Sequence, residues 1–293
     1  MIDPVIFTIH LGSIEFALRW YGVLVMLGVI VGGTVANKEV TRRGGDGEVI
    51  WDAMIWLLPI GIIGARLWYV VNATIGGNPY YMDNPIQIIN IPQGGLHFFG
   101  GLVFGAITLY FYLKQKKMDF WLFLDSIAPA ALLGQAVARP ANFINQELYG
   151  QPTALPWGIK IDAMHRLPLF NDLQVFPVET TRFHPTFAYE MIWNIFGFFI
   201  IMVLIQKVAQ FSKPGSAFSL WLFIAGIGRT FIEFFRPDQP ILAAGWLTTS
   251  MLVSFLMALV GFVLVLLRIG VLPWKNTIFP DQYTLPVEEK KVL

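Results

Sequence analysis

Residues 245–267 read GWLTTSMLVSFLMALVGFVLVLL and contain no charged side chain. A helix of about 20 mostly apolar residues spans the hydrocarbon core of a bilayer, which is roughly 30 Å thick. This stretch therefore predicts a transmembrane helix. Six further, predominantly apolar segments predict the same structure, at residues 14–36, 50–71, 98–113, 120–138, 187–206 and 218–235. We expect an all-α membrane protein with seven transmembrane helices.

The composition of the whole chain supports a membrane location. Of its 293 residues, 56% are hydrophobic and only 13% are charged, whereas about 25% of the residues of a soluble domain are charged. This excludes a water-soluble enzyme. The net charge of +1 excludes a disordered or nucleic-acid-binding chain. The chain has no cysteine, which excludes disulfides, cysteine–metal sites and a cysteine nucleophile.

Basic residues in the short loops predict the orientation. Lysine and arginine follow the first, third and fifth apolar segments and occur in the C-terminal tail, whereas residues 72–97 contain neither. Because positively charged loops stay on the cytoplasmic side, we expect the N-terminus outside and the C-terminus in the cytoplasm.

Two predicted external stretches are long enough to be structured. Residues 72–97 are rich in Asn, Pro, Gly and Tyr and show no helical period. Four prolines between residues 150 and 182 predict a small head of loops and short strands. We therefore expect a transmembrane domain at 1–275, whose residues 139–185 include this head, and a cytoplasmic tail at 276–293.

Polar and ionisable side chains gather at one depth, in the external ends of the predicted spans or directly beyond them. A charge in the hydrocarbon is costly and marks a candidate functional site. The group contains Tyr21, Arg66, Arg139, Asn142, Asn145, Glu147, His184, Glu190, Arg229, Glu233 and Arg236. Several arginines together favour an amphiphile with a phosphate head, because guanidinium binds phosphate through a bidentate fork.

Two simpler interpretations of these charges stay open. Arginines near an interface can extend their charge to water without any function. Arg229, Glu233 and Arg236 share one helix face and can form an intrahelical ion pair. We expect no metal site, because the four histidines show no HxxxH or HExxH spacing and no paired acidic motif is present.

Residues 138–150 read ARPANFINQELYG. The stretch resembles the signature of phosphatidylglycerol–prolipoprotein diacylglyceryl transferases, roughly G-R-x-G-N-F-x-N-x-E-x-x-G. It matches at Arg139, Asn142, Phe143, Asn145, Glu147 and Gly150. Further pieces follow the order found in that family: RWYG at 19–22, GARLWYV at 64–70, GGLHFFGGLVFG at 94–105, HPTFAYE at 184–190 and GRTFIEFFR at 228–236. The family has seven spans and an external N-terminus, as the loop charges predict independently.

Three positions depart from the family pattern. Phe99 stands where many members have a histidine before Gly-Gly-Leu, and His97 lies two residues earlier, out of register. Residues 140–141 and 225–226 also differ from the usual motifs. The first departure leaves the general base open among His97, His184 and Glu147. A further alternative is that arginines lower the pKa of the bound thiol enough to remove the need for a strong base.

The resemblance implies an enzyme without a cofactor in the bacterial cytoplasmic (inner) membrane, with its site toward the outer leaflet. It would transfer the diacylglyceryl group of phosphatidylglycerol to the lipobox cysteine of prolipoprotein signal peptides, forming a thioether and releasing glycerol phosphate. The implied catalytic residues are Arg139, Arg229, Tyr21, Glu147 and His184. The implied substrate-binding residues are Arg139, Asn142, Asn145, Gly150, Arg66, Glu233, Arg236, Gly100, Gly101 and His97.

Two other functions stay open. One is a related membrane lipid-phosphate transferase with another acceptor, and the other is a lipid-binding or lipid-transporting paralogue. A transporter would place polar groups throughout the membrane and show an internal repeat, whereas here these groups gather at one side.

Overall fold

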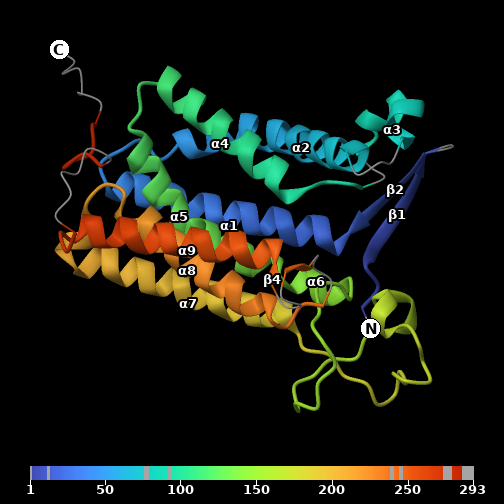
Figure 1. The fold of residues 1–293 in the computed structure, drawn as a ribbon. Helices are drawn as coiled ribbons and strands as arrows, with labels where there is room; N and C mark the ends of the chain where they lie inside the picture. Colours follow the sequence, from blue (N-terminus) through green and yellow to red (C-terminus); the bar gives the residue numbers. More distant parts are fainter. Residues whose placement is uncertain are drawn as a thin grey trace. The chain divides into compact units, whose positions relative to one another are not determined.

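The computed structural model describes residues 2–11, 14–75, 79–91, 94–237, 241–243, 247–272 and 279–285. Long helices dominate them: α1 (Trp20–Arg42), α2 (Val49–Ile75), α4 (Phe98–Gln115), α5 (Phe120–Ala138), α7 (Thr186–Lys207), α8 (Ser216–Glu233) and α9 (Thr249–Arg268) (Figure 1). Each predicted span falls on one of them. Among the described residues, five helices are long and apolar enough to cross a membrane: α1, α2, α5 with its continuation, α7 and α9. The protein is therefore a mostly helical, multi-pass membrane protein.

The first predicted span begins too early. Residues Ile14–Arg19 form strand β2, which pairs antiparallel with β1 (Val5–Leu11), and α1 begins only at Trp20. The prediction of helix at 14–19 is wrong because a second apolar stretch lies close enough in sequence to form a hairpin, and β-branched and aromatic residues suit such pairing.

The last predicted span also begins too early. Strand β4 (Leu247–Thr248) pairs with β3 (Ile241–Ala243), and α9 starts at Thr249. The Thr248 hydroxyl accepts a hydrogen bond from the Met251 amide at 3.0 Å. This N-cap fixes the start of the helix within the apolar stretch. Residues 244–246 lie outside the described residues.

The two stretches predicted to be external contain short elements. Between α2 and α4 lie α3 (Tyr80–Asp83) and η1 (Pro85–Ile89), where no helical structure was expected. Proline at the first position of η1 suits a helix start, because its missing N–H has no partner there in any case. The short helix α6 (Pro140–Ile144) precedes the second stretch, which contains two 3₁₀ helices, η3 (Ala163–His165) and η4 (Pro168–Phe170), where only loops and strands were expected. Isolated β-bridges join Phe183 to Pro152 and Ile159.

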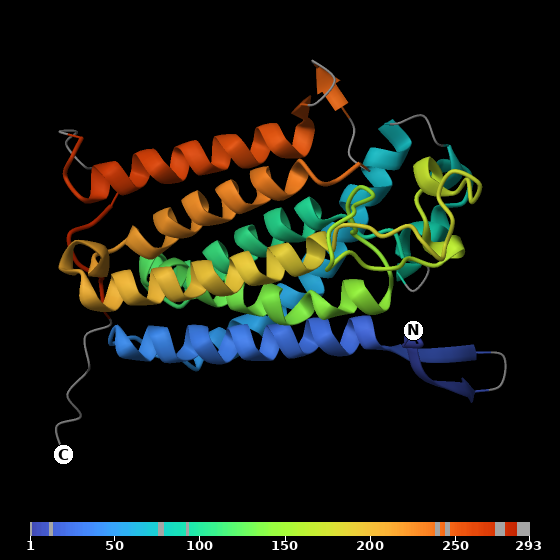
Figure 2. The same cartoon turned by 90° about the horizontal axis from the view of Figure 1, so that it is seen from below.

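The chain divides into two compact units. The first comprises Met1–Ala36 and Leu124–Gln282, and the second comprises Asn37–Phe123 and Tyr283–Leu293. In the first, α7, α8 and α9 lie side by side (Figure 2) over a core that includes Leu132, Ile201 and Ile224. In the second, α2 packs against α4. Most of the predicted tail at 276–293 lies outside the described residues, so the division at residue 275 stays a prediction.

Candidate functional site

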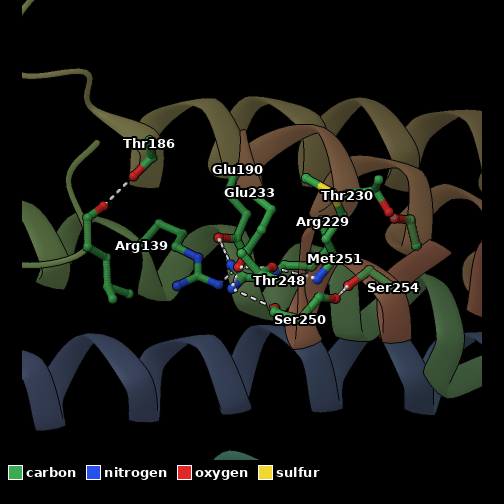
Figure 3. A network of polar contacts seen from close by, with 12 residues as sticks. Arg139, Thr186, Glu190, Arg229, Thr230, Glu233, Thr248, Ser250, Met251 and Ser254 are labelled. Atoms are coloured by element: carbon green, nitrogen blue, oxygen red, sulfur yellow. Dashed lines mark hydrogen bonds and ion pairs between the residues drawn. The ribbon is translucent and has the colours of Figure 1, made fainter. Parts of the chain in front are cut away.

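Two arginines of the first unit share one carboxylate (Figure 3). Arg139 follows the end of α5, Glu190 lies one turn into α7 and Arg229 lies in the last turns of α8. Arg139 Nη2 donates to Glu190 Oε1, and Arg229 Nη1 lies 4.0 Å from Glu190 Oε2. The arginine side chains are 21% and 28% exposed. They are therefore partly removed from solvent but still reachable by a ligand.

Arg229 has further partners on its other side. Its Nη2 lies 2.9 Å from Glu233 Oε2, one turn along the same helix, and 3.3 Å from Ser250 Oγ. Glu233 is buried and accepts a hydrogen bond from the Thr248 hydroxyl at 3.0 Å. The intrahelical ion pair predicted from the sequence is therefore present, and it is tied to the N-cap of α9.

Arg139 also contacts the segment that carries the sequence signature. Its Nη1 donates to Asn142 Oδ1 at 3.3 Å. Asn142 and Asn145 both donate to Glu147 Oε1, at 2.9 and 3.2 Å. Tyr21 lies within electrostatic range of both Glu147 and Arg139. The structure thus joins six predicted residues of the first unit, with Tyr21 near them: Arg139, Asn142, Asn145, Glu147, Arg229 and Glu233.

The signature segment has an unusual backbone. Gln146 and Leu148 have φ values of +53° and +52°, a left-handed conformation that costs free energy for any residue other than glycine. Gln146 is held by two hydrogen bonds of 2.7 Å, one to the Asp162 side chain and one from the Asp162 amide. These bonds to the head hold the segment in the conformation in which Glu147 accepts hydrogen bonds from both asparagines.

His184 and Gly150 lie where the head joins α7. The His184 Nδ1 is 3.0 Å from the Tyr189 hydroxyl, which also accepts from Trp157 Nε1 at 2.8 Å. Burial lowers the pKa of His184 below its ordinary value, which favours the neutral imidazole. The Gly150 amide donates to the His184 carbonyl at 2.8 Å. This hydrogen bond holds the backbone of the signature segment against the start of α7.

Arg236 lies three residues beyond the end of α8 at Glu233, so the prediction that it shares a helix face with Arg229 and Glu233 is wrong. Its amide donates to the Glu233 carbonyl at 3.1 Å, and its charge acts on Arg229. On another face of α8, an apolar groove of about 380 Å³ runs between α8 and α9, with Phe231, Phe234 and Phe255 in its walls.

Four predicted site residues belong to the second unit. Arg66 is buried and donates to the carbonyl oxygens of Gln87 and Gly94, both at 2.5 Å, of Ile88 at 2.9 Å and of Gly95 at 3.2 Å. The His97 amide donates to the Ala65 carbonyl at 3.0 Å, at the start of α4.

Gly100 and Gly101 of α4 face α2. A Cβ added to Gly100 would lie 2.3 Å from the Gly64 carbonyl oxygen, and one added to Gly101 would lie 3.4 Å from that of Gly61. Close helix packing therefore accounts for Gly100. The side chain of Phe99 lies outside the described residues. The ligand-binding roles expected for Arg66, His97, Gly100 and Gly101 stay predictions.

Three residues of the network were given no role from the sequence. Glu190 was noted as an intramembrane charge, and its signal was that an isolated carboxylate in a span needs a cationic partner. Thr248 and Ser250 are uncharged and stood inside a predicted apolar span, so no signal distinguished them. In the described part of the chain, no group of three or more His, Cys, Asp or Glu side chains could hold a metal ion.

Comparisons with known proteins agree with the resemblance found in the sequence. Residues 4–267 match the family described as prolipoprotein diacylglyceryl transferase. A phosphatidylglycerol–prolipoprotein diacylglyceryl transferase of Chloroflexus aggregans is 31% identical, over 99% of this chain and 98% of the relative. Proteins of the same name from Halalkalibacterium halodurans and Enterococcus faecalis are 37% and 35% identical; each alignment covers 88% of this chain, and 84% and 91% of the respective relative.

Proposed function

The chain belongs to the prolipoprotein diacylglyceryl transferase family, and we propose that the network around Arg139, Glu190 and Arg229 is its active site. The enzyme transfers the diacylglyceryl group of phosphatidylglycerol to a prolipoprotein, an early step of lipoprotein maturation. The observation that supports this placement is the pair of partly exposed arginines held by one carboxylate.

The reaction places specific demands on the site. The sulfur of the lipobox cysteine attacks a glyceryl carbon, a C–S bond forms and the C–O bond to phosphate breaks. Glycerol phosphate leaves with the bond's electron pair, and the thiol proton is released. Preorganised donors must therefore meet the charge that develops on the departing phosphate, which is usually a large contribution to catalysis.

We assign the phosphate to Arg139 and Arg229. Guanidinium groups stay charged and present several N–H donors in a planar fork, and both groups remain partly exposed in the network. Asn142 and Asn145 are uncharged donors suited to glycerol hydroxyls, with Glu147 orienting their amides. Tyr21, at the start of α1, is placed to contact the head group. The apolar groove between α8 and α9 suits an acyl chain.

The same arginines activate the thiol in this proposal. A free cysteine is only a few per cent thiolate near neutral pH, and neighbouring cations lower a thiol's pKa. This removes the need for a dedicated strong base. His184 then serves to position the junction between the head and α7 through Tyr189. Arg66 serves to hold the backbone of residues 87–88 and 94–95 against α2.

The membrane arrangement is part of the proposal. We place seven helices across the bacterial inner membrane, with the N-terminus outside, the C-terminus in the cytoplasm and the active site toward the outer leaflet. The distribution of lysine and arginine among the loops supports this orientation.

The test is a transfer assay with purified protein, phosphatidylglycerol and a lipobox peptide. Mass spectrometry should detect a diacylglyceryl thioether on the peptide and free glycerol phosphate. Arg139→Ala and Arg139→Lys should each lower kcat/KM at least about 100-fold, because lysine cannot reproduce the fork. Arg42→Ala, which removes a partly exposed arginine paired with Glu39 in the second unit, should keep near-normal activity.

Two outcomes would contradict this function or its placement. Tight binding of phosphatidylglycerol without product from any lipobox peptide would indicate another acceptor. Full activity in Arg139→Ala would show that the active site lies elsewhere.

A further inference from the structure

We propose that Glu190 is the positioning residue of the active site: it holds the guanidinium groups of Arg139 and Arg229 together and directs their unused N–H donors toward one phosphate. The inference rests on the proposed function and adds to it the group that assembles the phosphate site. Glu190 does not itself contact the reacting atoms in this role.

The geometry supports a bridging role. The two oxygens of Glu190 face different arginines, with Oε1 accepting from Arg139 and Oε2 lying 4.0 Å from Arg229 Nη1. The three residues come from α7, from the α5–α6 junction and from α8. A single carboxylate is therefore the point at which these three elements of the first unit are joined electrostatically.

The charge of Glu190 is required by its neighbours. Two guanidinium groups paired with one carboxylate lie close enough to repel each other, and partial burial strengthens the repulsion. Arg236 adds a third positive charge that acts on Arg229. On the other side, Glu233 is already engaged by Arg229 and by the Thr248 hydroxyl. Glu190 is thus the carboxylate that neutralises the region between the two arginines.

The bridge leaves donors available. An arginine carries five N–H donors. In Arg139, Glu190 takes one N–H of Nη2 and Asn142 takes one N–H of Nη1, which leaves the second N–H of each nitrogen for a ligand, whereas Nε is buried. In Arg229, the hydrogen bond to Ser250 and the close pairing with Glu233 both use Nη2. A phosphate that approaches both arginines therefore meets donors already oriented, without displacing Glu190.

The proposal predicts a specific kinetic effect of Glu190→Gln. Glutamine keeps the length and one acceptor oxygen but removes the negative charge. The arginines should repel each other and lose their alignment, so we expect kcat to fall at least about tenfold. The KM for phosphatidylglycerol should stay equal or decrease, because the site is more positive. For the same reason, added glycerol phosphate should inhibit the variant at least about threefold more strongly than it inhibits the wild type.

Glu190→Asp tests the negative charge at position 190 separately from the length of the side chain. Aspartate keeps the negative charge on a shorter side chain, so this variant should recover part of the lost kcat and restore the inhibition by glycerol phosphate to near the wild-type level. The matched control is Glu39→Gln. Glu39 is also a glutamate between two arginines, Arg42 at 2.7 Å and Arg43 at 3.7 Å, but it is more deeply buried and lies in the second unit. Its replacement should leave kcat and the inhibition by glycerol phosphate unchanged.

The outcomes distinguish this inference from the proposed function. If the wild type makes no thioether, the proposed function fails, whatever Glu190 does. If the wild type is active, an unchanged kcat in Glu190→Gln overturns the positioning role. A raised KM with normal kcat, or weaker inhibition by glycerol phosphate, would assign Glu190 to substrate binding instead. If Glu190→Gln does not fold, Glu190→Asp is the test. If glycerol phosphate inhibits Glu190→Asp more strongly than the wild type, the negative charge at position 190 does not control the phosphate site, and the positioning role is overturned.

Discussion

Gly150 shows how one residue of the signature can act through packing. An added Cβ would lie 2.6 Å from the Phe235 carbonyl oxygen and 2.9 Å from both His184 Cβ and Thr186 Cγ2. The Gln151 amide next to it donates to the same Phe235 carbonyl at 2.9 Å. Only glycine therefore allows the signature segment to reach the start of α7 and the end of α8 together.

The first prediction concerns this close contact. Gly150→Ala should lower the free energy of unfolding by about 1–3 kcal/mol, because the methyl group overpacks a site bordered by backbone. Chemical unfolding of the detergent-solubilised protein measures the change. Gly22→Ala is the control: nothing lies within 4 Å of its added Cβ, and alanine is the better helix former. Equal effects of the two substitutions would contradict the packing role.

His184 predicts how stability depends on pH. Burial lowers its pKa in the folded protein below the unfolded value of 6.5, so between these two values the unfolded state binds more protons. Its contribution to stability is therefore present above pH 6.5 and is lost as the pH falls through the folded-state pKa. The unfolding temperature should decrease from about pH 8 to about pH 5, and less steeply in His184→Gln.

Tyr189→Phe is the control for this pH dependence. It removes the hydroxyl at 3.0 Å from His184 Nδ1 but keeps the titrating imidazole, so the slope against pH should persist. If His184→Gln and the wild type have the same slope, the titration of His184 does not contribute.

At the scale of elements, α8 depends on a side chain of another helix. Asp125 of α5 is fully buried and accepts hydrogen bonds from the amides of Gly215 at 2.5 Å and Phe218 at 2.8 Å. These amides lie at the N-terminus of α8, where helix N–H groups lack intrahelical partners and the helix dipole favours a negative charge. Asp125 thereby fixes the end of α8 opposite to Arg229.

Replacing this carboxylate should destabilise the first unit. Asp125→Ala should lower the free energy of unfolding by roughly 2–4 kcal/mol, since two buried N–H groups lose a charged acceptor. Asp125→Asn, which keeps an acceptor oxygen, should lower it less. Asp46→Ala removes an exposed acceptor of the Glu48 amide at 3.0 Å and should cost about 0.5–1 kcal/mol. A cost for Asp125→Ala as small as that would show that α8 needs no such cap.

At the scale of the whole molecule, the proposed membrane topology is open to direct measurement. The chain contains no cysteine, so a single introduced cysteine is the only thiol. Asp3 and Asn171 lie in parts proposed to be outside, and Gln115 ends α4 at a loop proposed to be cytoplasmic.

A membrane-impermeant maleimide applied to intact spheroplasts should label Asp3→Cys and Asn171→Cys. It should label Gln115→Cys only after the membrane is permeabilised, because the charged reagent cannot cross the hydrocarbon. Labelling of all three variants before permeabilisation would contradict the seven-span arrangement. The reverse pattern would place the N-terminus in the cytoplasm.

The sequence predicted the main helices well but their first turns less well. Five of the seven predicted spans begin within two residues of the start of a long helix of the structure, because an apolar run is a property of the local chain. The helix starts predicted at residues 14 and 245 are too early, because α1 begins at Trp20 and α9 at Thr249. At both places a short strand precedes the helix, and the pairing of that strand with its neighbour is made by backbone groups, which the apolar pattern does not show.

The sequence by itself determined that this is a multi-pass membrane protein with arginines and glutamates in or next to its apolar helices, since composition and spacing need no partner. Only the tertiary structure decided which group each of these charged side chains binds. Glu190 meets two arginines that lie far from it in the chain, whereas Arg66 donates to backbone carbonyls. The physical reason is that a buried charge must find a counter-charge or a set of hydrogen-bond partners, and only folding determines which partner lies within reach.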